Sequence, residues 1–223
     1  MTNFMSNSIF FGAALSLIAY EVGLLLKRKF KMAIFNPLLI SIIAVIAVLC
    51  LLHIDYDTYN QSGQYISYLL TPATVCLAVP LYQQMELLKK NLKAVIIGIV
   101  SGVLASLVSV LILAKLFRLS HEQYVTLLPK SITTAIGMGV SEELGGIVTI
   151  TVAVIIITGV LGNMVAHIEE PIAKGLALGT SSHAIGTAKA MELGEIEGAM
   201  SSLAIAVAGL LTVVGASVFA QFM

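Results

Sequence analysis

The sequence predicts an all-α membrane protein with about eight transmembrane segments, some of them broken polar helices, and an internal repeat. Of its 223 residues, 58% are hydrophobic and only 11% are charged, whereas a soluble domain has about 25% charged residues. A helix that crosses a bilayer needs about 20 mostly apolar residues. Stretches of that kind lie at 8–26, 34–53, 94–114, 147–165 and 198–220. They do not alternate polar and apolar residues as the strands of a membrane barrel do.

The charges indicate the orientation of the chain and its surroundings. Twelve Lys and Arg balance twelve Asp and Glu, so nothing in the charge favours a nucleic-acid partner, and membrane lipid is the expected environment. Basic residues gather at 27–31 and 89–93. By the positive-inside rule both clusters are cytoplasmic and the N-terminus is external. Lys115 and Arg118 then lie on the outer side, against the rule.

The segment after the first two spans, about 65–88, contains helix-breaking residues. Pro72 and Pro80 each remove a helix hydrogen bond and free a carbonyl, and Thr71 and Thr74 stand close to them. A helix interrupted at membrane depth is tolerated where protein or a wet cavity satisfies the freed groups. We therefore predict a broken helix beside a site, with a simple packing kink as the alternative.

Two later segments are too polar for lipid-facing spans. Residues 120–146 are divided by Pro129, and residues 176–193 are rich in Ser, Thr and Gly. The chain has eight crossings if both segments span the bilayer and fewer if either is re-entrant. Between 65–88 and these segments, span 94–114 has one face of small residues suited to close helix packing: Gly98, Gly102, Ala105, Ser106 and Ser109.

The two polar segments repeat a phrase. "AIGMGVSEELGGI" (135–147) and "AIGTAKAMELGEI" (184–196) agree at seven of thirteen positions, where average composition gives roughly one. Each copy leads into an apolar span, a pattern typical of transporters built from repeats. With both segments crossing, the copies run in parallel; a re-entrant copy changes that relation. Independent evolution of similar packing residues is the alternative.

These observations predict one integral domain over 1–223. Spans 8–53 are its scaffold, and 65–221 form a core with repeated units at 128–165 and 178–220.

A broken helix directs unpaired N–H groups and a partial positive charge toward whatever lies before its N-terminus. Hydroxyls and ionisable groups precede both copies of the phrase, which predicts a site for a small carboxylate. With the threonines of 65–88, the candidate binding residues are Thr71, Thr74, Lys130, Ser131, Thr133, Thr134, Ser181, Ser182 and His183. The candidate break or hinge residues are Pro72, Pro80, Pro129, Gly137, Gly179 and Gly186.

Several of these residues have a second interpretation. His183 is either an anion or proton site or a packing histidine, and Lys130 is either a site charge or an interfacial lysine. Glu169 and Glu170 precede Pro171 and are expected to begin a helix. No enzyme motif is present, and we expect no cofactor and no metal; Cys50 and Cys76 lack metal or redox spacing.

The chain resembles the LrgB/CidB family of bacterial inner-membrane proteins. The resemblance covers nearly all of it and is most specific in "LLTPATVCLAVPLY" (69–82), "LLPKSITTAIGM" (127–138) and "GTSSHAIGTAKAMELGEIEGAMSSLAI" (179–205). It implies two functions. One is antiholin-like control of murein hydrolase activity and lysis with a small LrgA/CidA-type membrane partner. The other is transport of small monocarboxylates such as pyruvate or glycolate.

The residues favour the carrier, because a holin-like assembly does not need broken polar elements. We expect a secondary transporter or exporter of the bacterial inner membrane. By analogy with carriers of this size, a homodimer is also expected.

Overall fold

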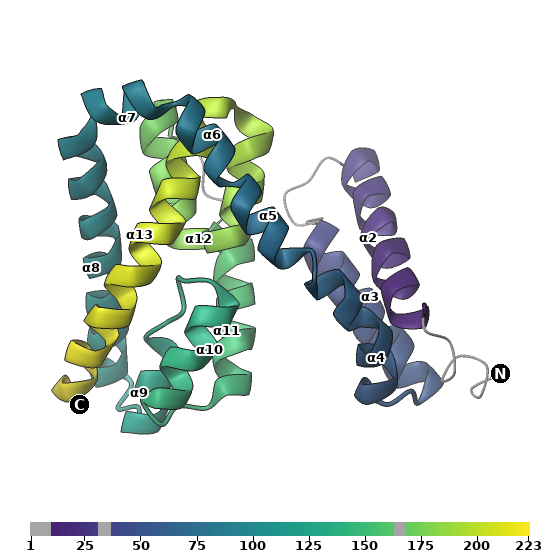
Figure 1. Ribbon diagram of the computed structural model, residues 1–223. Helices are drawn as coiled ribbons and strands as arrows, with labels where there is room; N and C mark the ends of the chain where they lie inside the picture. Colours follow the sequence, from purple (N-terminus) through teal and green to yellow (C-terminus); the bar gives the residue numbers. More distant parts are fainter. Residues whose placement is uncertain (1–9, 31–36, 163–167) are drawn as a thin grey trace. The chain divides into compact units, whose positions relative to one another are not determined.

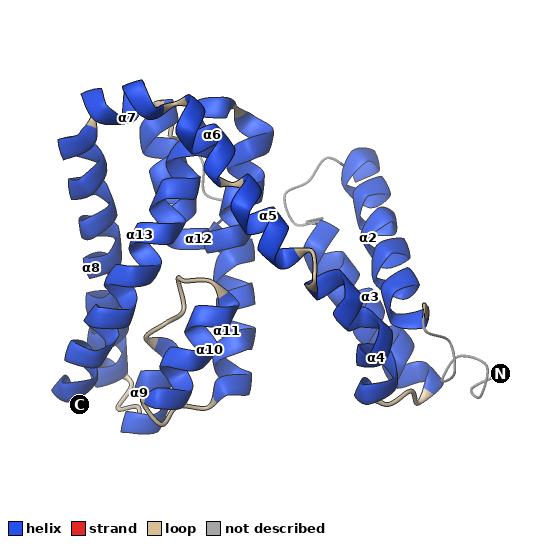
Figure 2. Ribbon diagram, viewed as in Figure 1, coloured by secondary structure: helices blue, strands red, loops and turns tan. Residues whose placement is uncertain are grey.

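The computed structural model describes residues 10–30, 37–162 and 168–223. Every regular element within these ranges is a helix (Figures 1 and 2), which confirms the all-α prediction. Two helices, Leu92–Leu116 and Glu195–Phe222, are long and apolar enough to span a membrane on their own, and Pro37–Leu52 and Val148–Gly162 are shorter apolar helices. The predicted number of eight transmembrane segments is not confirmed.

The chain divides into two compact units, 1–75 and 76–223. In the first, α2 (Phe11–Phe30) packs against α3 (Pro37–Leu52) and α4 (Tyr56–Ser67). The Ser62 hydroxyl is fully buried and accepts a hydrogen bond from the Gly12 N–H. The first N–H groups of a helix lack partners within it, so this bond joins α4 to the start of α2. Whether the chain is a single domain stays a prediction.

The proline-rich segment is broken, as predicted. It forms α5 (Leu70–Cys76), α6 (Ala78–Gln83) and α7 (Met85–Lys90), all short. Pro72 and Pro80 lie in the first turns of α5 and α6. Proline is tolerated there because the first N–H groups of a helix have no intrahelical acceptor. Leu77, between α5 and α6, keeps right-handed helical dihedrals (φ −64°, ψ −20°), so the interruption there is a local loss of helical hydrogen bonds at a proline.

The core of the second unit lies between α8 (Leu92–Leu116) and α13 (Glu195–Phe219). One face of α8 is buried at helical spacing: Val95, Ile99, Val103, Leu107, Val110 and Ala114. Helix α13 contributes small buried residues, since Ala199, Ala204, Ala208 and Ala216 are almost inaccessible; a Cβ on its Gly215 would lie 2.6 Å from the Leu107 side chain of α8. Small side chains let two membrane helices approach closely.

The first polar segment forms a hairpin. It consists of α9 (His121–Leu127), a turn over 128–133 and α10 (Thr134–Glu143). After α10 the chain returns beside α9, where the Thr126 hydroxyl accepts a hydrogen bond of 2.8 Å from the Ile147 N–H. The next helix, α11 (Val148–Gly162), therefore starts at the end of the unit from which α9 entered (Figure 1).

The second polar segment is also a hairpin. Helix α12 (Pro171–Leu193) is interrupted at His183, which has φ 41° and ψ −130°. Its first limb runs parallel to α13: a Cβ on Gly175 would lie 3.0 Å from Glu197 Cα, and one on Gly179 would lie 3.0 Å from Ser201 Cα.

The second limb of α12 runs the opposite way. The Thr187 and Ser201 hydroxyls are 2.9 Å apart, and a Cβ on Gly198 would lie 3.3 Å from Met191 Cα. From Thr187 to Met191 the chain advances along α12, while the residues that they contact on α13 go back from Ser201 to Gly198. The two helices are therefore antiparallel here. The chain turns back at His183, and α12 enters and leaves at one end of the unit.

These two hairpins reverse the predicted relation between the repeats. Helix α11 begins beside α9, whereas α13 ends there, since the Tyr124 hydroxyl donates a 2.9 Å hydrogen bond to the Phe219 carbonyl. The apolar helices of the two repeats therefore run in opposite directions (Figure 1). The prediction of parallel copies was wrong, because it assumed that both polar segments cross.

Candidate functional site

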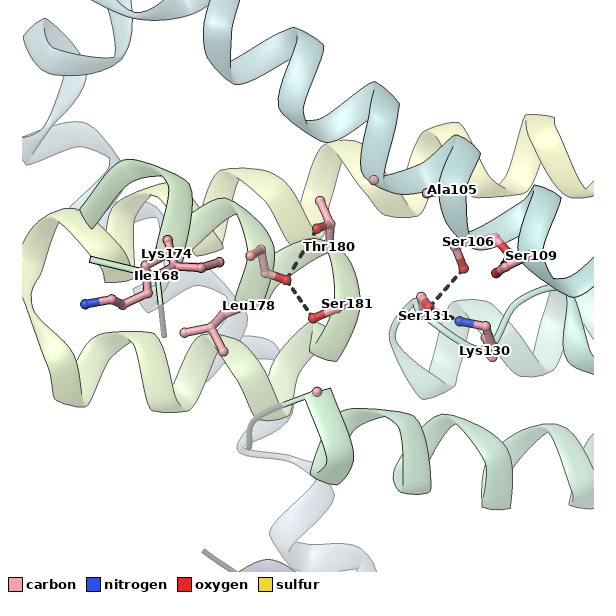
Figure 3. A pocket seen from close by; sticks show the side chains of 13 residues that line it. Ala105, Ser106, Ser109, Lys130, Ser131, Ile168, Lys174, Leu178, Thr180 and Ser181 are labelled. Carbon is pink, nitrogen blue, oxygen red and sulfur yellow. Dashed lines mark hydrogen bonds between the residues drawn. The ribbon is translucent and has the colours of Figure 1, made fainter. Parts of the chain in front are cut away.

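A cavity of about 490 Å³ lies in the second unit, lined mainly by three elements and also by Gly162 at the end of α11 and by Ile168. Helix α8 contributes its small-residue face, the turn of the first hairpin contributes two polar residues, and the first limb of α12 contributes its inner side (Figure 3). The polar residues that line it are Ser106, Ser109, Lys130, Ser131, Lys174, Thr180 and Ser181.

Lys130 and two serines form one end of the cavity. The Lys130 Nζ donates to the Ser131 Oγ at 3.1 Å, and the Ser131 Oγ lies 3.0 Å from the Ser106 Oγ of α8 (Figure 3). Among the described residues, no carboxylate lies within 4.0 Å of the Lys130 Nζ. A half-buried ammonium with only a hydroxyl as partner has lost hydration without gaining a counter-charge. An anion in the cavity would supply that charge.

The α12 side of the cavity contributes two hydroxyls. Thr180 donates to the Leu176 carbonyl at 2.8 Å, and Ser181 donates to the Ala177 carbonyl at 2.6 Å. Hydroxyls satisfied by their own helix can rotate toward a ligand, because the carbonyls that they release keep their helical hydrogen bonds. The α8 backbone also comes close here: a Cβ on Gly102 would lie 3.1 Å from the Thr180 Oγ1.

His183 lies at the tip of the α12 hairpin and is not one of the lining residues. Its side chain is 2% exposed, and its Nε2 lies 3.0 Å from the Ile155 carbonyl of α11. A carbonyl only accepts, so Nε2 carries the hydrogen and Nδ1 is an acceptor in the neutral ring. No partner for Nδ1 exists in the described part of the chain.

A glycine on α11 makes room for the imidazole, since a Cβ on Gly159 would lie 2.8 Å from Nε2.

The structure brings together some of the predicted binding residues. Lys130, Ser131 and Ser181 line the cavity. Ser182 and His183 are buried and do not line it, although the Ser182 Oγ lies 3.0 Å from the Ser181 Oγ.

The remaining candidates are not among the described lining residues. Thr133 and Thr134 are half-buried at the start of α10 and are not among the lining residues. Thr71 and Thr74 belong to α5 in the first unit, and their side chains fall outside the described part of the structure. A role in binding stays a prediction for every one of the nine residues.

Sequence reasoning missed several lining residues. Ser106 and Ser109 were interpreted as part of a packing face, although their hydroxyls could have indicated that they line a polar cavity. Lys174 was not considered; it lies in the first turns of α12, after the residues expected to begin a helix. Thr180 was not missed: it corresponds to Ser131 at the repeat offset of 49 residues, and the hydroxyls before the second copy of the phrase were already expected to face a substrate.

The helix breaks lie at some of the predicted positions. Pro129 lies in the turn of the first hairpin, and Pro72 and Pro80 follow breaks. Gly137, Gly179 and Gly186, in contrast, lie inside helical limbs. These three glycines permit close packing: a Cβ would lie 2.6 Å from the Ser201 carbonyl at Gly179, and 2.6 Å from the Ser182 Cβ at Gly186. The break in α12 falls at His183, and a hinge role for the glycines stays a prediction.

Comparison with known proteins gives consistent matches. The family model described as the LrgB-like family matches residues 16–222. Proteins named antiholin-like protein LrgB from Bacillus mycoides, Bacillus cereus and Bacillus anthracis are each 40% identical over 221 residues, covering 96% of this chain and 96% of the relative. No solved structure matches the chain significantly.

Proposed function

The chain belongs to the LrgB-like family, and from this membership and the cavity we propose that it is a secondary carrier of small monocarboxylates such as pyruvate or glycolate. The membrane is the bacterial inner membrane, and the N-terminus is external, as the basic clusters at 27–31 and 89–93 indicate. The family name points to a membrane protein without enzymatic activity. No step of the proposed transport requires a cofactor.

The observation that carries the proposal is the uncompensated Lys130 ammonium in a cavity with hydroxyls on both sides. The cavity volume of about 490 Å³ exceeds the needs of a three-carbon acid and leaves space for water. An ammonium and serine hydroxyls are donors suited to a carboxylate. A holin-like assembly has no need for such a cavity.

The inverted hairpins support the same proposal. Many carriers consist of inverted repeats whose discontinuous helices meet near the middle of the bilayer, with helix N-termini directed at an anionic substrate. Here α10 begins at Thr134 and the second limb of α12 begins after His183, each at the tip of its hairpin. We propose six crossing segments and two re-entrant hairpins. Transport would then expose the cavity alternately to the two sides.

A second candidate function comes from the names of the relatives. Proteins 40% identical to this chain are called antiholin-like, which favours a regulator of murein hydrolase activity and lysis. Such a regulator would act with an LrgA/CidA-type partner and through its own assembly, including a homodimer. Altered carboxylate flux could also produce a lysis phenotype. A transport assay therefore distinguishes the two candidate functions, and a lysis assay does not.

Uptake of labelled pyruvate and glycolate into liposomes tests the proposal. The purified chain is reconstituted with and without a small LrgA-type protein, and with and without a proton gradient. Lys130→Met should lower uptake about tenfold or more, because a hydrogen bond to a charged group contributes about 1.5–3 kcal/mol. Lys189→Met is the matched control, since Lys189 forms an ion pair of 2.8 Å with Glu192 on the surface. Absence of uptake under every condition, or equal uptake by Lys130→Met, would refute the carrier.

A further inference from the structure

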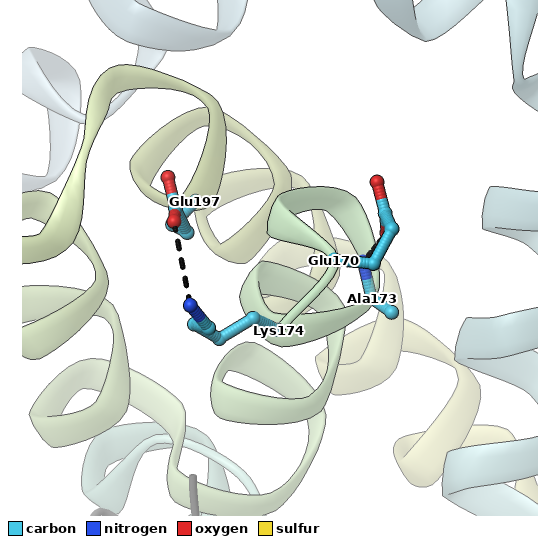
Figure 4. Close-up of polar contacts among 4 residues, drawn as sticks. All are labelled: Glu170, Ala173, Lys174 and Glu197. Carbon is cyan, nitrogen blue, oxygen red and sulfur yellow. Dashed lines mark hydrogen bonds and ion pairs between the residues drawn. The ribbon is translucent and has the colours of Figure 1, made fainter. Parts of the chain in front are cut away.

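Two lysines line the cavity, and they differ in their partners. Lys130 has only the Ser131 hydroxyl, as described above. The Lys174 Nζ lies 3.8 Å from the Glu197 Oε1 (Figure 4), and the two side chains are 20% and 12% exposed. None of the described residues that line the cavity is a carboxylate. Glu197 therefore acts on the cavity from outside it, through Lys174.

The fold fixes this ion pair from both helices. Glu170 caps the start of α12 by accepting a 2.6 Å hydrogen bond from the Ala173 N–H (Figure 4), as expected for a carboxylate before Pro171. Glu197 lies in the first turn of α13, where the helix dipole favours a negative charge. The two turns approach closely because Gly175 has no side chain, since a Cβ there would lie 3.0 Å from Glu197 Cα.

The direction of Lys174 matters for the cavity. Lys174 is one of the lining residues, and Figure 3 shows its ammonium directed away from Lys130 and Ser131. Lysine side chains commonly place the stem against a surface and the charge elsewhere. Without Glu197, the same flexible side chain could turn its charge toward the cavity.

From this geometry we infer that Glu197 is a specificity-determining residue that restricts the cavity to monoanions by neutralising Lys174. The inference rests on the proposed carrier function. With the pair intact, Lys130 is the one uncompensated positive charge that the described lining residues present to a ligand. A monocarboxylate balances that charge, whereas a dicarboxylate brings a second negative charge into a partly buried site without compensation.

Three charge changes test the inference, because each predicts a different direction. Glu197→Gln keeps the shape of the side chain and leaves the Lys174 charge without a partner. The affinity for malonate relative to pyruvate should then rise about tenfold. This is the effect of one additional unit charge on the second carboxylate of malonate at about 10 Å and an effective dielectric constant of about 20. Lys174→Gln leaves the Glu197 charge uncompensated, so the same ratio should fall. The double variant restores the net charge and should return the ratio close to that of the wild type.

The measurement is competition of unlabelled malonate or pyruvate against labelled pyruvate on the full chain in liposomes. Glu192→Gln is the matched control, because it removes one carboxylate of a surface ion pair with Lys189 and should leave the ratio unchanged. A pair that only joins α12 to α13 would lower both affinities alike in both single variants.

An unchanged ratio in Glu197→Gln and Lys174→Gln, with pyruvate still bound, would overturn this inference alone. Failure of the wild type to bind pyruvate would overturn the carrier function, and this inference with it. If Glu197→Gln does not fold, Lys174→Gln still decides, because only the charge mechanism predicts that it discriminates against malonate.

Discussion

The break at His183 predicts an unusual order of stability between two substitutions. At φ 41° and ψ −130°, the residue is close to the first central position of a type II′ turn, which glycine dominates. A residue with a Cβ is strained there by about 1–3 kcal/mol, and glycine is not. His183→Gly and His183→Ala both lose the imidazole and its hydrogen bond to the Ile155 carbonyl, so these losses cancel in the comparison. His183→Gly should therefore be the more stable variant by about 1–3 kcal/mol.

A continuous helix predicts the opposite order. In a helix interior alanine is more stable than glycine by about 1 kcal/mol. A break at His183 and a continuous helix therefore predict opposite signs for the difference in stability between His183→Gly and His183→Ala. Thermal and denaturant unfolding in detergent, followed by circular dichroism, measures that sign. Ala206→Gly is the matched control: Ala206 is exposed in the middle of α13, and the substitution should cost about 1 kcal/mol. Equal stability of the two His183 variants, or greater stability of His183→Ala, would refute the hairpin.

Three further predictions concern the packing and topology of the second unit. Gly179→Ala should destabilise the protein by about 1–3 kcal/mol, since its Cβ would meet α13; Gly139→Ala, with open space around it, should be neutral or stabilising by up to about 1 kcal/mol, and detergent unfolding measures both. Thr151→Val should cost about 1–3 kcal/mol by the same assay, because its buried hydroxyl joins the hairpin α9–α10 to α11, whereas Thr151→Ser should cost less. Cysteines at Glu143 and Glu192, in a background without native cysteines, should react with an impermeant thiol reagent from opposite sides of the membrane; labelling from the same side would contradict the inverted repeats.

The sequence was sufficient to predict the helices and the interrupted segment with its prolines. Hydropathy was not sufficient to distinguish a polar segment that crosses from one that turns back, because both have the same composition and length. Only contacts between residues distant in sequence, such as Thr187 with Ser201, determine the direction of a limb. For the same reason the parallel arrangement of the repeats was a wrong prediction.

The position of the second break also depends on tertiary contacts. Glycine is the residue with the freest backbone, so Gly179 and Gly186 were the natural candidates, yet each is needed to let another segment approach. His183 adopts the strained conformation because its surroundings hold it there. Its imidazole is bonded to the Ile155 carbonyl and fits against Gly159. Strain at a non-glycine residue persists only where packing determines it, and packing is not readable from local sequence.

The repeated phrase explains how one short pattern can build both sides of a site. Each copy supplies a hairpin tip followed by a helix start, and the inversion makes the two tips enter from opposite ends of the unit. Lys130 and Ser131 belong to one tip, and Thr180 and Ser181 belong to the first limb at the other tip; all four line the same cavity. If the copies were parallel, both hairpins would enter the unit from the same end, and their tips could not face one another across a cavity. The orientation of the repeat, more than the identity of its shared residues, therefore decides whether these polar groups converge.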